Sequence, residues 1–145
     1  MMSEQVDAFI SGLIRKTNEK CLEWKSYLIC PIRRDVNEEI YNGRAGFDVG
    51  INSIRESKSY YFSAGEGYVF LFEVFHGDPE VTSPELDTIS LMVKINASAH
   101  LDDLSLYGSN EQQRLEELRL LVEKDIEEKI CYPDDLYKFM EQVIS

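Results

Sequence analysis

Residues 60–75 read YYFSAGEGYVFLFEVF, and this stretch decides the fold. Two aromatic and β-branched runs flank a short turn that contains Gly65 and Gly67, a pattern typical of a β-hairpin. The second run, Tyr68 to Phe75, is apolar at both sets of alternating positions, which favours a central strand covered on both faces. The hairpin therefore predicts the middle of a sheet, and it carries no catalytic motif.

Other segments predict the strands around this hairpin. Residues 47–51 and 89–95 alternate apolar and polar side chains, and we expect the second of these strands to be buried on one face only. Residues 21–32 predict a first strand or extended segment ended by Pro31, in which Trp24 anchors the preceding helix on the sheet. We interpret residues 33–43 as a loop or a short helical turn, and residues 54–58 and 96–108 as irregular connections.

Apolar periodicity predicts three amphipathic helices, over residues 3–20, 109–129 and 134 to the chain end. Ser109 and Gln112 resemble a capping box at the start of the second helix. A helix, four or five mostly antiparallel strands and two more helices make an α+β fold. We expect the two C-terminal helices to pack on one sheet face. The 145 residues fit a single domain, 1–145.

The charge balance restricts the partners. With 27 acidic and 15 basic residues the net charge is −12, which disfavours binding to nucleic acids and to anionic membranes. The same charge suits a basic protein partner, because complementary fields speed encounter. Acidity also simply keeps a protein soluble.

The three cysteines are Cys21, Cys30 and Cys131. An odd number without a CxxC pair disfavours a disulfide framework or a zinc site, and their apolar neighbours predict small buried side chains. The N-terminus lacks the pattern of a signal peptide, and no run approaches the roughly 20 apolar residues of a membrane span. We therefore expect a reducing cytoplasm.

Catalytic patterns are weak. A nucleophilic pair between any of the cysteines and His76 or His100 is formally possible, but no local signature supports it. His76, Asp78 and Glu80 could present three metal ligands on one side of an extended segment, although the intervening glycine and proline are typical of a turn. We expect no catalytic site, no metal and no cofactor.

Charged residues outside the hairpin are the candidate interaction sites. The adjacent Arg33 and Arg34 could clamp a phosphate or carboxylate, or they could pair with nearby acidic residues. The acidic side of the 109–129 helix could meet a basic partner, or be only a solvated face. The hairpin aromatics could stack on bases, but an acidic chain favours core packing for them. The candidate interaction residues are Arg33, Arg34, His76, Asp78, Glu116, Glu123 and Glu127.

The order of these features resembles small uncharacterised α+β proteins of bacteria. The resemblance is carried by FISGLIRKT at residues 9–17, LEWK at 22–25, SYY at 59–61, GYVFLF at 67–72 and the helix over 115–130. It implies a fold and no activity or catalytic residues. Size, acidity and layout are also similar in style to immunity proteins of bacterial toxin systems.

Three functions follow as hypotheses. The first is a non-enzymatic cytoplasmic protein that acts through protein–protein interaction, as an immunity-type inhibitor of a basic partner would. The second is a small-molecule binding module, with a pocket between sheet and helices lined by Trp24, Tyr68 and Phe70. The third is an enzyme that uses a cysteine or histidine.

Overall fold

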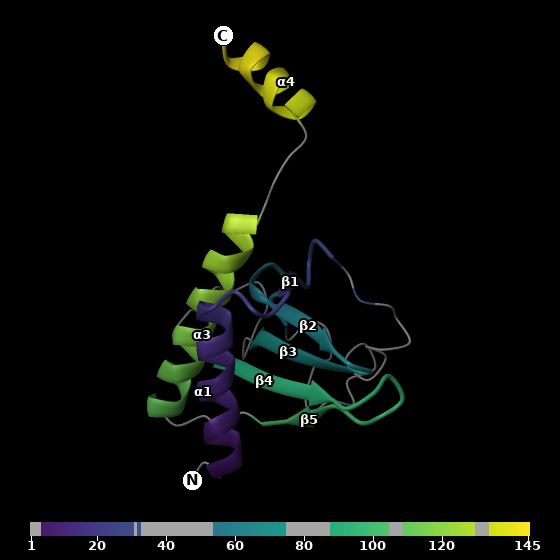
Figure 1. Ribbon diagram of the computed structural model, residues 1–145, viewed down its shortest axis with the longest axis vertical. Helices are drawn as coiled ribbons and strands as arrows, with labels where there is room; N and C mark the ends of the chain where they lie inside the picture. Colours follow the sequence, from purple (N-terminus) through teal and green to yellow (C-terminus); the bar gives the residue numbers. More distant parts are fainter. Residues whose placement is uncertain (1–3, 31, 33–53, 75–87, 105–108, 130–133) are drawn as a thin grey trace.

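The computed structural model describes residues 4–30, 32, 54–74, 88–104, 109–129 and 134–145. Over these residues, five antiparallel strands form one sheet in the order of the chain, and two long helices lie side by side against it (Figure 1). The α+β arrangement expected from the sequence is confirmed. The strand predicted over 47–51 lies outside the described residues.

The hairpin forms as predicted. β2 (Tyr60–Ala64) pairs antiparallel with β3 (Gly67–Val74), and Ala64 lies opposite Gly67. Gly65 has a φ of 60°, the left-handed conformation that tight hairpin turns require. β3 lies between β2 and β4 (Thr88–Lys94), and all its residues except Tyr68 are buried. It is therefore the central strand, covered on both faces.

β4 is also covered on both faces, so the prediction of a one-sided strand is wrong. Ser90 and Met92 are each 1% exposed and Lys94 is 4% exposed. Met92 lies opposite Phe70, and Ser90 lies opposite Phe72. Phe70, Phe72 and Met92 belong to a second buried cluster on that side of the sheet, so the positions of β4 that the sequence suggested were solvated lie beside a second core.

The outer strands are short. β1 (Lys25–Ser26) pairs with β2, so the strand predicted within 21–32 is only two residues long. β5 (Asp102–Asp103) pairs with β4 and was not predicted, because aspartate is depleted in strands. The 3-10 helix η2 (Glu56–Lys58) precedes β2.

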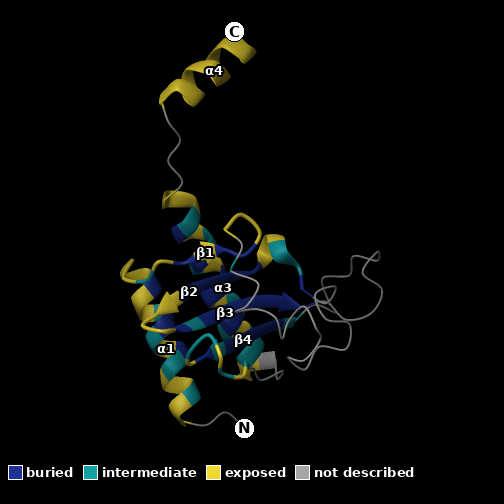
Figure 2. Cartoon of the chain, turned by 90° about the vertical axis from the view of Figure 1, so that its right-hand side faces the viewer, coloured by how far each residue is buried: buried dark blue, intermediate teal, exposed yellow. Residues whose placement is uncertain are grey.

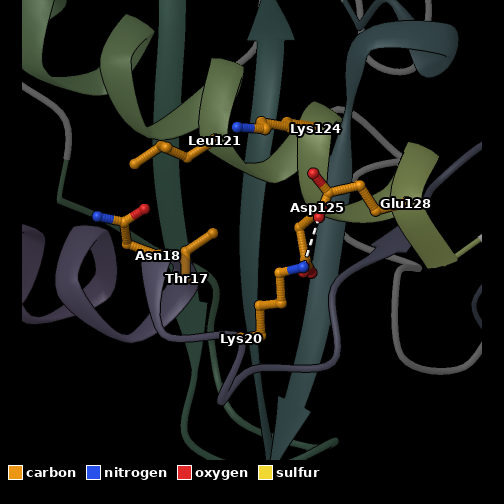
Figure 3. A pocket seen from close by; sticks show the side chains of 7 residues that line it. All are labelled: Thr17, Asn18, Lys20, Leu121, Lys124, Asp125 and Glu128. Carbon is orange, nitrogen blue, oxygen red and sulfur yellow. Dashed lines mark ion pairs between the residues drawn. The ribbon is translucent and has the colours of Figure 1, made fainter.

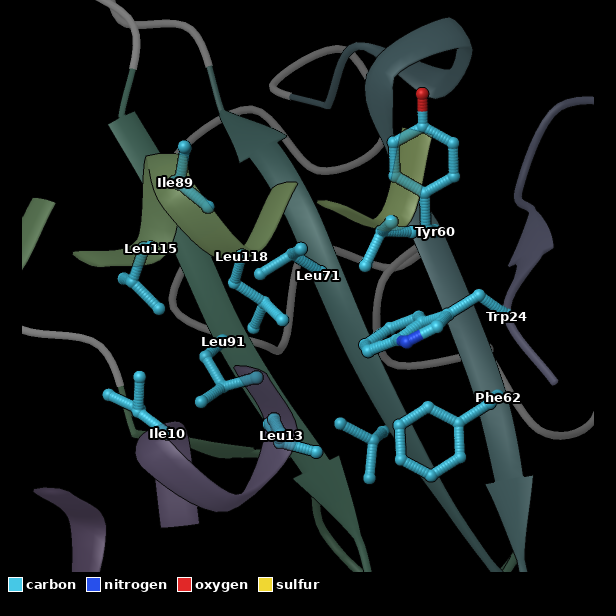
Figure 4. Close-up of a cluster of buried hydrophobic side chains, with 12 residues drawn as sticks. Ile10, Leu13, Trp24, Tyr60, Phe62, Leu71, Ile89, Leu91, Leu115 and Leu118 are labelled. Atoms are coloured by element: carbon cyan, nitrogen blue, oxygen red, sulfur yellow. The ribbon is translucent and has the colours of Figure 1, made fainter. Parts of the chain in front are cut away.

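Two helices cover one face of the sheet. α1 (Glu4–Asn18) and α3 (Ser109–Lys129) run in the same direction. Two ion pairs show this: Arg114 pairs with Asp7 near the starts of the helices, and Lys20 pairs with Glu128 near their ends. Their apolar sides meet the sheet in one cluster (Figure 4). The buried members are Ile10, Leu13, Trp24, Tyr60, Phe62, Val69, Leu71, Ile89, Leu91, Leu115, Leu118 and Val122.

Trp24 anchors α1 to the sheet as predicted. Its ring meets Phe62 of β2 edge-on, with 4.6 Å between ring centroids. Its indole N–H donates a hydrogen bond to Thr17 Oγ1 at 3.0 Å. Both partners are buried, so this bond satisfies the polar end of the tryptophan inside the core.

Gln112 fixes α3 to the edge of β4. Its side-chain amide accepts from the Ile89 N–H at 2.8 Å and donates to the Ile89 C=O at 2.9 Å. The Gln112 amide thus makes the two hydrogen bonds that the backbone of a neighbouring strand would otherwise make with Ile89. Further along this edge the Leu104 N–H donates to the Leu91 C=O at 2.8 Å.

The last helix does not join the core. α4 (Asp134–Ile144) forms where the sequence predicts it, but all eleven of its residues are exposed. Figures 1 and 2 show it beyond the C-terminal end of α3. The prediction that both C-terminal helices pack on the sheet is therefore right for α3 and wrong for α4.

Gly67 is required where β3 begins. A Cβ at this position would lie 2.4 Å from the Lys94 carbonyl oxygen and 2.9 Å from that of Ile95. We predict that Gly67→Ala lowers the free energy of unfolding by about 1–3 kcal/mol, measured by urea denaturation. The control is Gly12→Ala, where a Cβ meets nothing within 4 Å and removal of a helical glycine should raise stability by about 1 kcal/mol. Equal stabilities would contradict the close approach.

The Thr17–Trp24 bond gives a second prediction. Thr17→Val keeps the shape of the side chain but leaves the buried indole N–H without its acceptor, so it should lower the free energy of unfolding by about 1–3 kcal/mol. Thr17→Ser retains the hydroxyl and should recover most of that loss. Unfolding followed by fluorescence of the single tryptophan measures both variants. Two variants of equal stability would show that the bond contributes nothing.

Candidate functional site

A buried arginine organises the acidic side of α3. Arg119 is 9% exposed and lies between Glu116 and Glu123. Its Nη1 donates to Glu123 Oε1 at 2.6 Å, and its Nη2 donates to Glu116. Two of the acidic candidate residues are therefore ion-paired within α3, and only part of the acidic face predicted from the sequence is open to a partner. Glu127, the third, is exposed.

Tyr60 links β2 to this arginine cluster. Its hydroxyl donates to Glu123 Oε1 at 3.2 Å. Burial, together with the negative charge of Glu123, raises the pKa of Tyr60 well above its usual value. The phenol therefore stays protonated near neutral pH and acts as a hydrogen-bond donor that holds α3 on the sheet.

A second charged pair joins the buried Glu73 to the partly exposed Arg55. Glu73 of β3 carries Oε2 3.7 Å from Arg55 Nε. Ser59 Oγ accepts from the Glu73 N–H at 3.1 Å and donates to the Arg55 carbonyl at 2.8 Å. Arg119 and Arg55 each lie beside carboxylates of opposite charge, and such pairing is the usual condition for keeping charges in a protein interior.

A polar cleft of about 190 Å³ opens between the end of α1 and α3 (Figure 3). Lys20 Nζ lies 2.6 Å from Glu128 Oε2 across it, and hydrogen bonding between them raises the pKa of Lys20 and lowers that of Glu128. Lys20 has a φ of 60° and ends α1 in a position usually taken by glycine. The cleft is lined by Thr17, Asn18, Lys20, Leu121, Lys124, Asp125 and Glu128.

Asp125 is the most buried charged group of this cleft. It is 4% exposed, and Lys129 Nζ lies 2.9 Å from its Oδ2. Its Oδ1 has no hydrogen-bond partner. A water molecule suits such an oxygen in a polar cleft. The lysines and carboxylates of this cleft offer hydrogen bonds and ion pairs to one another.

An apolar groove of about 330 Å³ lies on the other side of α1. One wall is α1, and the floor comes from Phe62 and Ala64 of β2 and Val69 of β3. Gly12 borders the groove with open space, since a Cβ there would meet nothing within 4 Å. The full lining is Ala8, Phe9, Gly12, Leu13, Lys16, Leu22, Phe62, Ala64 and Val69.

α4 presents a second apolar surface. Its large side chains recur at the spacing of one helix side, and all are exposed. The exposure is greatest at the end of the helix, where Val143 is 66% and Ile144 is 85% exposed. We call the six side chains the α4 face: Leu136, Tyr137, Phe139, Met140, Val143 and Ile144.

The predicted small-molecule pocket does not form from the residues named for it. Trp24 belongs to the cluster under the helices, whereas Phe70 and Tyr68 belong to the cluster on the opposite side of the sheet. Residues on opposite faces cannot line one pocket. The prediction missed this because Trp24 stands outside the alternating strand pattern that assigns the other residues to faces.

The cysteines also differ from expectation. Cys21 and Cys30 are exposed, not buried, because they lie in the connections that follow α1 and β1. His100 is exposed too. Cys131 and four candidate residues lie outside the described residues: Arg33, Arg34, His76 and Asp78. Among the residues that are described, no three His, Cys, Asp or Glu side chains gather as metal ligands would.

Comparison with protein-family models, with curated proteins and with solved structures finds no match to this chain. Within the described part of the chain, no helix has both the length and the apolar character needed to cross a membrane. Among the described residues, the α4 face and the α1 groove are two apolar surfaces that remain open.

Alkaline pH tests the Tyr60 contact. The pKa of the Tyr60 phenol is higher in the folded chain than in the unfolded chain, where it is near 10. The free energy of unfolding is therefore unaffected by this group below about pH 10 and falls as the pH rises above that value. We predict that Tyr60→Phe loses less stability than the wild type between neutral pH and pH values above about 10, measured as thermal midpoints across pH. Parallel curves for the wild type and Tyr60→Phe would contradict the burial of this phenol.

Proposed function

We propose that the chain is a non-enzymatic interaction protein and that α4 is its main binding element for a basic protein partner. The single observation that carries the proposal is the exposed α4 face. Soluble proteins rarely leave a contiguous apolar patch of this kind open unless it meets a partner. An amphipathic helix with one apolar side is also a recurrent form of ligand for a groove on another protein.

Charge defines the kind of partner. The chain has a net charge of −12, and Asp134, Asp135 and Glu141 lie on α4 itself. An apolar groove with a basic rim would complement both the face and the charges of this helix. An inhibitor of the immunity type is one protein of this description.

The chemistry of the remaining surface agrees with this function. The acidic residues near Arg119 hold ion pairs, and Lys20 in the neighbouring cleft is paired with Glu128. Cys21 and Cys30 are free and exposed, which suits the reducing cytoplasm that we propose as the compartment.

The test is partner capture followed by reconstitution. Phe139→Asp together with Val143→Asp places charges in the α4 face, and Lys138→Ala with Gln142→Ala is the matched control on its polar side. A partner captured by the wild type should be basic, and the purified pair should bind roughly tenfold or more weakly with the first variant. The control should bind like the wild type, and added salt should weaken the complex.

Two outcomes would reject the proposal. One is a partner that binds the charged α4 variant as well as it binds the wild type. The other is the absence of any captured protein that binds the purified chain at low salt. Because no residue of α4 is buried, circular dichroism should show both variants folded, so that loss of binding reports on the surface.

A further inference from the structure

The groove beside α1 lies where one side of a further helix could pack against α1 and the hairpin. On the helix-covered face of the sheet, α3 and α1 lie side by side, and the groove follows next to α1 over the turn end of the β2–β3 hairpin. Ala8 and Gly12 stand one turn apart on its wall. Small side chains at this spacing let another helix approach closely.

α4 fits this groove in length. Its eleven residues make a helix of about 16 Å at 1.5 Å per residue. The wall from Ala8 to Lys16 spans about 12 Å on the same rise. The α4 helix is therefore long enough to lie along the entire wall of the groove.

The charges favour an antiparallel arrangement. Lys16 is exposed at the C-terminal end of the groove wall. Asp134 and Asp135 form the first turn of α4. An α4 that runs antiparallel to α1 brings these aspartates to Lys16, and it also sets the two helix dipoles in opposition.

The exposed apolar area of the α4 face sets how large an interface between two copies can be. The six side chains of the α4 face are 39–85% exposed, so one helix offers apolar surface on the order of 600 Å², given roughly 150–250 Å² for a large side chain. Two fully covered α4 faces would contribute about twice that, which is the lower limit of the roughly 1,200–2,000 Å² of standard interfaces.

We infer that the α1 groove receives α4 of a second copy of the chain, so that two molecules exchange their C-terminal helices. α4 stands clear of its own body in Figure 1. A two-fold exchange covers both α4 faces and both grooves with one repeated contact. The inference rests on the proposed function, because it uses the same α4 face, and it adds a regulation: the basic partner must displace the second copy.

Salt separates the two associations. Each chain carries −12, so two copies repel each other at low salt and should associate more tightly when salt screens that repulsion. A complex with a basic partner has the opposite dependence. An exchange dimer therefore strengthens under the conditions that weaken the partner complex.

The experiment is sedimentation velocity of the full chain over a range of concentrations at low and moderate salt. Gly12→Leu fills the groove, and the open space at Gly12 lets the fold accept the added side chain. The wild type should show a monomer–dimer equilibrium that Gly12→Leu weakens roughly tenfold or more. Gly12→Ala is the matched control and should still dimerise. Phe139→Asp should abolish the dimer.

Each other result overturns the inference. The inference is wrong if the wild type stays monomeric at all concentrations. It is also wrong if Gly12→Leu leaves the dimer unchanged. A monomer whose α4 amides are protected from hydrogen exchange would place α4 in the groove of its own chain. Gly12→Leu leaves α4 intact, so retained binding of the basic partner by this variant separates failure of the dimer from failure of the proposed function.

Discussion

The structure depends on the burial of β3 from both sides. Phe70, Leu71 and Phe72 have no exposed surface, and consecutive residues of a strand point to opposite faces. Leu71 joins the cluster under α1 and α3, whereas Phe70 and Phe72 stack at 5.2 Å in the cluster of the other face. One strand thus belongs to two cores, and the helices, β2 and β4 are all arranged around it.

Polar contacts orient the elements that these cores hold together. The Trp24–Thr17 bond sets the end of α1, and the Gln112 amide sets the start of α3 on β4. The cluster around Arg119 connects the middle of α3 to β2 through Tyr60. Because the buried charges of this cluster are used within the fold, we look for function on surfaces that the fold leaves uncovered.

Two such surfaces have complementary character. The α4 face is convex, apolar and acidic at its start, and the α1 groove is concave, apolar and basic at one end. We propose a basic protein as the partner of the first, and a second copy of the chain as the competitor that occupies it in the partner's absence. The net charge makes these two associations respond to salt in opposite directions.

The sequence by itself determined the hairpin, three helices and the α+β order, because turn residues and apolar periodicity are local signals. It also indicated an anchor at Trp24. Only the tertiary structure decided which surfaces are covered. Ser90 and Lys94 look solvated in the sequence, yet they are buried on β4, opposite Phe72 and Tyr68 of β3. The stripe of α4 predicts a helix that packs, and it says nothing of where, since periodicity encodes which side of a helix is apolar and not which surface meets it.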